Sequence, residues 1–217
     1  MGKIFFRQPF RYEYKHRVIF IILLNFAVYG IAHLYRELAQ YIYIYGPMNP
    51  GYVYKYHMYW QFLTYMFVHD YSNIRHILFN MLGLLVFGLQ LEKAIGSKEF
   101  VLFYLLCGIL SCIFSYAVYF FTGQYKVSLL GASGAVYAVL FAYAVFFPRS
   151  VIFIWGLIPV PAPVLVLIYA AIEFFSQFNP ASGVAHMTHL FGFLAAWLYF
   201  VIRMGIHPLK IWRDTYR

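Results

Sequence analysis

The stretch GASGAVYAVLFAYAVFFPR, residues 131–149, decides how this chain must fold. Its apolar run from 133 to 147 has fifteen residues, which as a helix cover about 22 Å, whereas the hydrocarbon core of a bilayer is about 30 Å thick. If Arg149 holds one end at the interface, Ser133 stops roughly 8 Å short of the opposite surface. Unpaired N–H groups at that depth are tolerable only inside protein or beside a water-filled cavity, where they favour bound anions.

The composition as a whole indicates a membrane protein. Of the 217 residues, 64% are hydrophobic and 11% are charged, well below the roughly 25% charged residues of soluble domains. No stretch has the composition of a separate soluble domain. We therefore expect a single all-α membrane domain over residues 1–217, a six-transmembrane-helix bundle with a short buried fourth helix and a long first external loop. The six apolar segments are 17–38, 74–91, 99–121, 133–147, 163–178 and 184–203.

Positive charge gathers at the two ends of the chain. The net charge is +9, and six spans would put both ends on one side, with twelve Lys and Arg there against four on the other side. We expect a polytopic protein of the bacterial inner (cytoplasmic) membrane with both termini cytoplasmic, a retained first span, and no nucleic-acid binding. The cations that flank the first and last segments are Lys3, Arg7, Arg11, Lys15, Arg17, Arg203, Lys210, Arg213 and Arg217.

Two connecting segments are less regular. The Tyr-rich segment 41–59 contains the turn signal Gly46-Pro47-Met48-Asn49-Pro50-Gly51 and is too polar to span a membrane. Its alternating tyrosines fit a hairpin, or short helices in the membrane interface, and we favour the helices. The segment 151–163 holds three prolines, so we expect a connector and not the start of a regular helix.

Ser133 is the first candidate for chemistry. It lies in Gly131-Ala132-Ser133-Gly134, where small neighbours permit a tight turn and the close approach of a substrate backbone. The simpler alternative is a serine that caps the helix, and the short motif alone does not decide between the two.

Two histidines in the sixth segment offer a base for that serine. His186 and His189 are ionisable residues in an apolar segment, and such residues tend to mark function. Small residues four apart follow both Ser133 and His189, so the fourth and sixth helices can pack closely and bring the two side chains together. An interior histidine with a structural hydrogen bond is the alternative. The small residues are Gly134 and Ala138 on the fourth helix, and Gly192 and Ala196 on the sixth.

His76 and Asn80 share one face at the start of the second segment, because they are four residues apart. Both can donate a hydrogen bond to a developing oxyanion, as can the Ser133 backbone N–H. A hydrogen-bonded pair that joins helices is the alternative. We expect His69, seven residues earlier, to be a surface residue.

A zinc site is a rival use of the histidines. His69, His76, His186 and His189 could supply ligands, but the chain has no HExxH motif. We therefore expect no metal and no cofactor. Glu92 and Glu173 lie near helix ends, where we expect them to pair or to extend toward the interface and not to relay protons.

Taken together, these motifs resemble the rhomboid family of intramembrane serine proteases over about residues 60–197. The resemblance implies a Ser–His dyad without an acid, in which Ser133 is the nucleophile and His189 the general base. It implies oxyanion donation by His76 and Asn80, and single-span membrane proteins in the bilayer as substrates, cut in or near their transmembrane helix. The motifs are His76-Ile77-Leu78-Phe79-Asn80, Leu91-Glu92-Lys93, Gly131-Ala132-Ser133-Gly134 and Ala185-His186-Met187-Thr188-His189-Leu190-Phe191-Gly192.

Supporting positions and departures complete the comparison of motifs. Gly131, Gly134, His186 and Gly192 support the site, and Tyr137, one turn beyond Ser133, is placed to pack against the His189 ring. Where the family often has Trp-Arg in its first loop, this chain has Trp60-Gln61.

Two other classes of function are open to a protein of this composition. One is an inactive relative that binds membrane helices, although such members usually lack the serine or the histidine, and this chain has both. The other is a transporter, which would favour internal repeats and paired charges at the midplane. We see no repeat and no such charges in the sequence.

Overall fold

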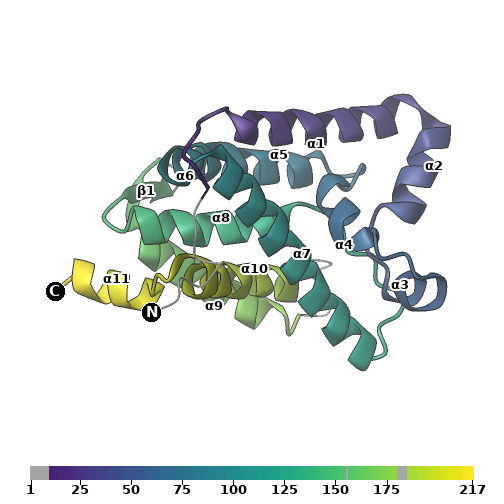
Figure 1. The fold of residues 1–217 in the computed structure, drawn as a ribbon. Helices are drawn as coiled ribbons and strands as arrows, with labels where there is room; N and C mark the ends of the chain where they lie inside the picture. The colour runs from purple at the N-terminus through teal and green to yellow at the C-terminus, as the bar shows by residue number, and fades with distance from the viewer. Residues whose placement is uncertain (1–9, 155, 180–184) are drawn as a thin grey trace.

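The computed structural model describes residues 10–154, 156–179 and 185–217, and it is a bundle of helices around one central helix (Figure 1). That helix is α8 (Ser133–Phe146), in which ten of fourteen residues are buried. Most of the buried residues are Ala, Gly and Val, whose small side chains let the neighbouring helices approach. The short buried fourth helix that the sequence predicts therefore forms the core.

Among the described residues, four helical stretches are long and apolar enough to cross a membrane. They are α1 (Arg17–Leu34); the consecutive α5 (Ile74–Gly83), η3 (Leu84–Gly88) and α6 (Leu89–Ile95); α7 (Ser97–Phe121); and α10 (His186–Tyr199) with η4 (Phe200–Met204). Two shorter apolar helices are α8 and α9 (Ala162–Ser176). A helix overlaps each of the six apolar segments, and by length and composition four of the described stretches suffice for a membrane span. Residue 184 lies outside the described residues.

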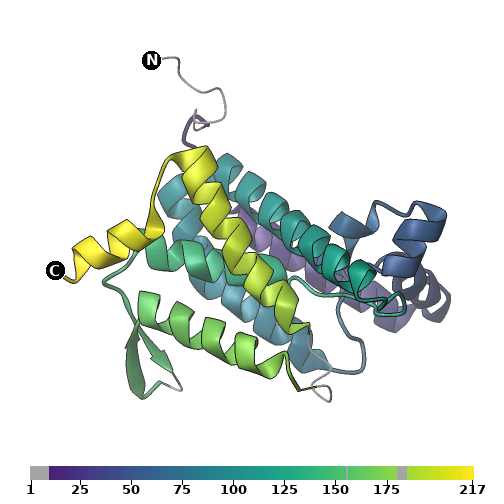
Figure 2. The ribbon, with the colours of Figure 1, turned by 90° about the horizontal axis from the view of Figure 1, so that it is seen from below.

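The helices surround α8 on several sides. Figure 2 shows α10 running in front of α8, and α10 contacts α7, α8 and α9. The α5–α6 stretch packs on α8 from another side, and α1 lies at the edge of the bundle, beyond that stretch (Figure 1). Because many α1 side chains face outward and are apolar, this helix suits a lipid environment.

The first loop is built of short helices and not of a hairpin. The first apolar helix ends at Leu34, four residues earlier than expected, because Tyr35 is extended. Three helices follow: α2 (Arg36–Tyr45), α3 (Pro50–Tyr56) and α4 (Gln61–Thr64), with the 3-10 turn η2 (Tyr65–Phe67). They gather at one end of the bundle (Figure 1).

Gln61, which follows Trp60, anchors this loop. The Gln61 side chain is fully buried, and its Oε1 accepts the Asn49 N–H at 3.0 Å. The loop also pairs with the segment that leads into α8, because Met48 and Leu129 exchange two backbone hydrogen bonds of 2.9 Å. The first loop therefore helps to fix the position at which α8 begins.

Two elements were not expected. Residues 151–161 form an antiparallel hairpin of β1 (Val151–Ile154) and β2 (Ile158–Pro161), so the fold is not strictly all-α. Both strands of this short hairpin are edge strands, in which prolines are tolerated. Pro163 lies in the first turn of α9, where a helix needs no N–H donor.

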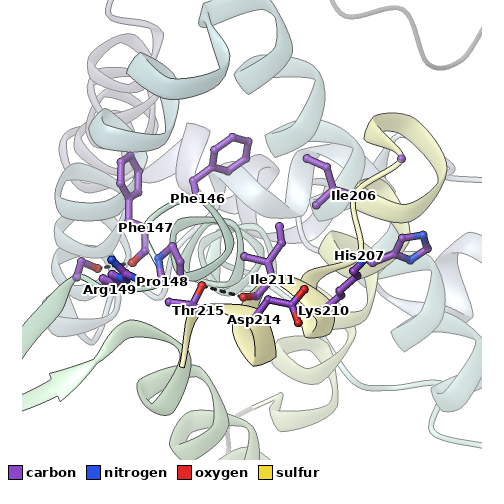
Figure 3. Close-up of a pocket in the computed structure, with 12 residues that line it drawn as sticks. Phe146, Phe147, Pro148, Arg149, Ile206, His207, Lys210, Ile211, Asp214 and Thr215 are labelled. Carbon is purple, nitrogen blue, oxygen red and sulfur yellow. Dashed lines mark hydrogen bonds between the residues drawn. The ribbon is translucent and has the colours of Figure 1, made fainter. Parts of the chain in front are cut away.

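The second unexpected element is α11 (Pro208–Thr215), which lies against the end of α8. Trp212 Nε1 donates a 2.9 Å hydrogen bond to the Ala144 carbonyl, and the Tyr216 hydroxyl donates one of 2.7 Å to the Pro148 carbonyl. Figure 3 shows residues of α11 facing Phe146–Arg149 across a pocket of about 830 Å³. This pocket is at the far end of α8 from Ser133, so it is separate from the candidate active site.

Candidate active site

Ser133 and His189 are in direct contact. The Ser133 hydroxyl lies 2.7 Å from His189 Nε2, although the two residues are 56 positions apart in the chain. Ser133 is the first residue of α8, and its neighbour Ala132 is the N-cap, without a side-chain cap hydrogen bond. The alternative of a capping serine therefore does not describe this structure. His189 lies in the first turn of α10 and is only 8% exposed.

Glycines on the two helices make this contact possible. A Cβ added at Gly192 would lie 2.2 Å from the Gly134 carbonyl oxygen, so only glycine allows the backbones to come this close. α10 is also tied to α7, because the hydroxyls of Thr188 and Ser115 are 2.7 Å apart. The close helix packing that the sequence pattern favoured is the packing that places Ser133 beside His189.

The His189 ring is stacked on Tyr137. The two rings are 4.3 Å apart between centroids and 9° from parallel. Tyr137 lies one turn after Ser133 on the same helix, so the ring that flanks the histidine and the serine that contacts it are carried by one rigid element. Stacking restricts the imidazole to one plane, in which Nε2 faces the serine.

Glu173 of α9 is the site residue that the sequence analysis missed. Its carboxylate accepts a hydrogen bond from the Tyr137 hydroxyl and lies 2.5 Å from His186 Nδ1 and 3.0 Å from His189 Nδ1. The His189 contact is at ion-pair distance but is not aligned as a hydrogen bond. Glu173 is 5% exposed, so of the two roles expected for it, the structure shows pairing with other side chains and not extension toward the interface.

Glu92, the other glutamate assigned in the same way, is fully buried and has a structural role. Its carboxylate accepts the backbone N–H groups of Arg17 and Val18, at 2.7 and 3.0 Å, and the Ser97 hydroxyl. Glu92 thus satisfies the first N–H groups of α1, which a helix leaves unpaired. It does not extend toward the interface either.

His76 and Asn80 of α5 lie beside the segment that precedes Ser133. A Cβ added at Gly131 would meet His76 Nε2 at 2.6 Å and Asn80 Nδ2 at 3.7 Å. Gly131 has a φ of +109°, which side-chain-bearing residues rarely adopt. Both candidate donors therefore converge on the backbone next to the serine, although Asn80 Nδ2 here donates to the His76 carbonyl at 2.9 Å.

His69 is buried, with only 1% exposure, so the expectation of a surface residue is wrong. Its ring meets the His76 ring edge to face at 5.2 Å, and its Nε2 accepts the Ala132 N–H at 3.4 Å. Burial, with a smaller effect of the nearby His76, lowers the pKa of His69 to about 3, so the ring is neutral at pH 7. His69 thus supports the turn before Ser133.

Glu173, His186 and His189 have the residue types of a metal site. One ligand atom from each lies within 4.8 Å of the others. In a tetrahedral site, two ligand atoms that each lie 2.0–2.2 Å from one ion are about 3.4 Å apart. The histidine nitrogens lie only 2.5 and 3.0 Å from the carboxylate, so the three groups are closer together than the ligands of such a site. In the part of the chain that the structure describes, neither His69 nor His76 belongs to this group.

Comparison with known proteins agrees with the arrangement. The family model described as "Rhomboid domain" matches residues 56–205, a range that includes every site residue named above. Rhomboid-related protein 1 of Caenorhabditis elegans is 28% identical over 166 residues, which are 73% of this chain and 42% of that protein. The chain thus spans about two fifths of the length of this curated relative.

Proposed function

Since the chain belongs to the rhomboid family, we propose that it is an intramembrane serine endopeptidase that cleaves single-span membrane proteins in or near their transmembrane helix. The observation that carries the proposal is the 2.7 Å separation of the Ser133 hydroxyl and His189 Nε2. This is the geometry of a nucleophile within reach of its base. A simple interhelical hydrogen bond does not explain this pair well, because Tyr137, Glu173 and His186 are also gathered around His189.

The reaction is acyl transfer. His189 Nε2 takes the Ser133 proton as Oγ bonds to the scissile carbonyl carbon, and the imidazolium then gives that proton to the departing amine nitrogen as the peptide bond breaks. Water, deprotonated by the same nitrogen, next attacks the acyl carbon. The bond from that carbon to Oγ then breaks, Oγ takes the proton from Nε2, and the new carboxyl group is released. The Ser133 N–H, which has no partner within α8, and the side chains of His76 and Asn80 are proposed to hold the oxyanion.

The depth of the site suits a substrate within the bilayer. The fourteen residues of α8 span about 21 Å, so one end of this helix lies below the surface of a core that is about 30 Å thick. A helical substrate hides its carbonyls in backbone hydrogen bonds, so it must unwind locally before Ser133 can reach one. We therefore expect substrates with helix-breaking residues and with a small residue before the bond that is cut.

We propose that both ends of the chain face the cytoplasm of a bacterial cell. The guanidinium of Arg203 lies 5.2 Å from the centre of the Phe10 ring, so the two described ends share one side of the bundle. The basic residues concentrated on that side favour the cytoplasmic face. Cysteine residues introduced near each end, in a variant without Cys107 and Cys112, can be tested for access to a membrane-impermeant thiol reagent.

The decisive test compares wild type with Ser133→Ala in proteoliposomes that contain a single-span substrate. Ser150→Ala is a matched control, because Ser150 lies just past the other end of α8 and its hydroxyl donates only to the Phe147 carbonyl. Wild type and Ser150→Ala should cleave the substrate and react with a fluorophosphonate at Ser133. Ser133→Ala should do neither.

Two results would contradict the proposal. Cleavage by Ser133→Ala at the wild-type rate would show that another group is the nucleophile. A folded wild type that neither cleaves nor reacts with the fluorophosphonate would favour the inactive alternative, a protein that binds membrane helices.

A further inference from the structure

The buried carboxylate of Glu173 extends the Ser133–His189 pair into a line of three groups. We propose that Glu173 is a positioning residue that holds His189 in its reactive tautomer and balances the charge that this histidine acquires during the reaction. The inference rests on the proposed function, and it departs from the acid-free dyad that the resemblance implies.

The first argument is the set of partners around the carboxylate. The Tyr137 hydroxyl, His186 Nδ1 and His189 Nδ1 all approach it, and each can donate a hydrogen. An ionised carboxylate only accepts hydrogen bonds, so the presence of three donors indicates that Glu173 is negatively charged. A buried carboxylate is costly unless it is paired, and both of its nitrogen partners belong to histidines.

The second argument is the tautomer that the reaction requires. If Nε2 of His189 is to accept the Ser133 proton, the ring hydrogen of the neutral histidine must be on Nδ1. That nitrogen is buried and has no aligned hydrogen bond among the residues that the structure describes. Glu173 Oε1, at 3.0 Å from Nδ1, is an acceptor within reach of that hydrogen.

The third argument is charge. When Ser133 transfers its proton to Nε2, the His189 ring becomes a cation inside a low-dielectric bundle, where an unpaired charge is unfavourable. A carboxylate 3.0 Å from Nδ1 stabilises this cation throughout the acyl-transfer steps. The Nδ1 hydrogen stays on the histidine, so Glu173 acts by position and charge and not by taking up a proton.

The surrounding contacts keep the carboxylate in place. Tyr137 both stacks on the His189 ring and donates its hydroxyl to Glu173. His186, one turn before His189, holds the other carboxylate oxygen at 2.5 Å. Glu173 thereby joins α9 to α8 and α10 at the level of the serine, and its oxygens cannot turn away without breaking one of these contacts.

The test compares Glu173→Gln with Glu92→Gln. Both replace a buried glutamate by an amide of the same shape, but Glu92 contacts the start of α1 and not the site. Glu173→Gln should lower kcat by about 10²–10⁴-fold and leave KM within about threefold of wild type, because substrate binding does not use the carboxylate. Glu92→Gln should leave kcat within about threefold.

A second readout does not depend on turnover. In protein labelled with nitrogen-15 at histidine, wild type should show His189 with its hydrogen on Nδ1, and Glu173→Gln should shift that ring toward the Nε2–H tautomer. Resonances are assigned with His189→Gln. A merely structural role of Glu173 would leave the tautomer unchanged.

The outcomes separate this inference from the proposed function. Wild-type kcat and tautomer in Glu173→Gln, with Ser133 still required for cleavage, would overturn the inference alone. Loss of wild-type activity in EDTA, restored by Zn²⁺, would also overturn it by assigning the carboxylate and the histidines to a metal. A wild type that neither cleaves nor labels at Ser133 would overturn both.

Discussion

Replacing Gly192 by alanine should push α8 and α10 apart. The added Cβ would lie 2.2 Å from the Gly134 carbonyl oxygen, whereas carbon–oxygen contacts settle at about 3.3–3.6 Å. The two backbones must therefore separate by about 1 Å. Because Ser133 adjoins Gly134 and His189 lies one turn before Gly192, their 2.7 Å hydrogen bond would lengthen to roughly 3.7 Å, which is no longer a hydrogen bond.

The expected cost falls on activity and on stability. A displacement of this size lowers kcat about 10²-fold, and overpacking lowers the free energy of unfolding by about 1–3 kcal/mol. Cleavage of a single-span substrate in proteoliposomes measures the first, and unfolding in mixed micelles with increasing SDS measures the second. Gly192→Ala should cleave the substrate more slowly than wild type and should unfold at a lower SDS content.

Gly30→Ala is the matched control, because a Cβ at Gly30 in α1 meets no heavy atom within 4 Å. This variant should keep wild-type activity and gain up to about 1 kcal/mol, since alanine favours helix more than glycine does. If Gly192→Ala cleaves and unfolds like Gly30→Ala, the close approach of α8 and α10 is not what holds the serine beside the histidine, and the reasoning from helix packing is refuted.

Two further predictions concern α5 and the turn before the serine. Asn80→Ala should lower kcat by about 10²–10³-fold with little change in KM, measured with the same substrate, because an oxyanion donor acts mainly in the transition state; an unchanged kcat would remove Asn80 from that role. The free energy of unfolding should fall by about 2 kcal/mol between pH 7.5 and pH 5, because His69 gains a proton near pH 6.5 in the unfolded chain, whereas burial holds its folded pKa at about 3. This contribution to stability is fully present above pH 6.5 and is lost as the pH falls toward 3. The free energy of unfolding of His69→Gln should therefore depend less on pH than that of wild type. An equal dependence in both proteins would contradict the low pKa of His69.

The sequence predicted the parts of the fold that depend on local patterns. Apolar segments of sufficient length located the helices, and the short run after Ser133 identified the helix that the structure places at the core. Small residues four apart predicted which helix faces meet, because close backbone contact requires them. What these patterns did not predict was the hairpin at 151–161, where a run of prolines was compatible with several conformations.

Residues whose role depends on tertiary contacts were assigned less well. Glu173 and His186 are 13 positions apart and belong to different helices, so no spacing rule links the two, and only the packing of α9 reveals their contact. The available signal was an ionisable residue in an apolar segment, which marks function by default. His69 lies in a polar loop sequence, which by itself indicates exposure. It is buried because it packs against His76 of α5 and against Ala132, which is 63 positions away in the chain.

The hydrogen bonds between α11 and the end of α8 show that the folded unit of this chain extends beyond the part that matches the family. The match to the family model ends at residue 205, yet Trp212 and Tyr216 lie beyond it and donate to carbonyls at and just after the last turn of α8. A protein shortened to the homologous part would leave the Ala144 carbonyl without its donor, at a cost of about 1–3 kcal/mol. The last turn of α8 would lose its contacts first, and Ser133 is the first residue of the same helix. Removal of the C-terminal tail could therefore displace the nucleophile, although the tail lies outside the matched region.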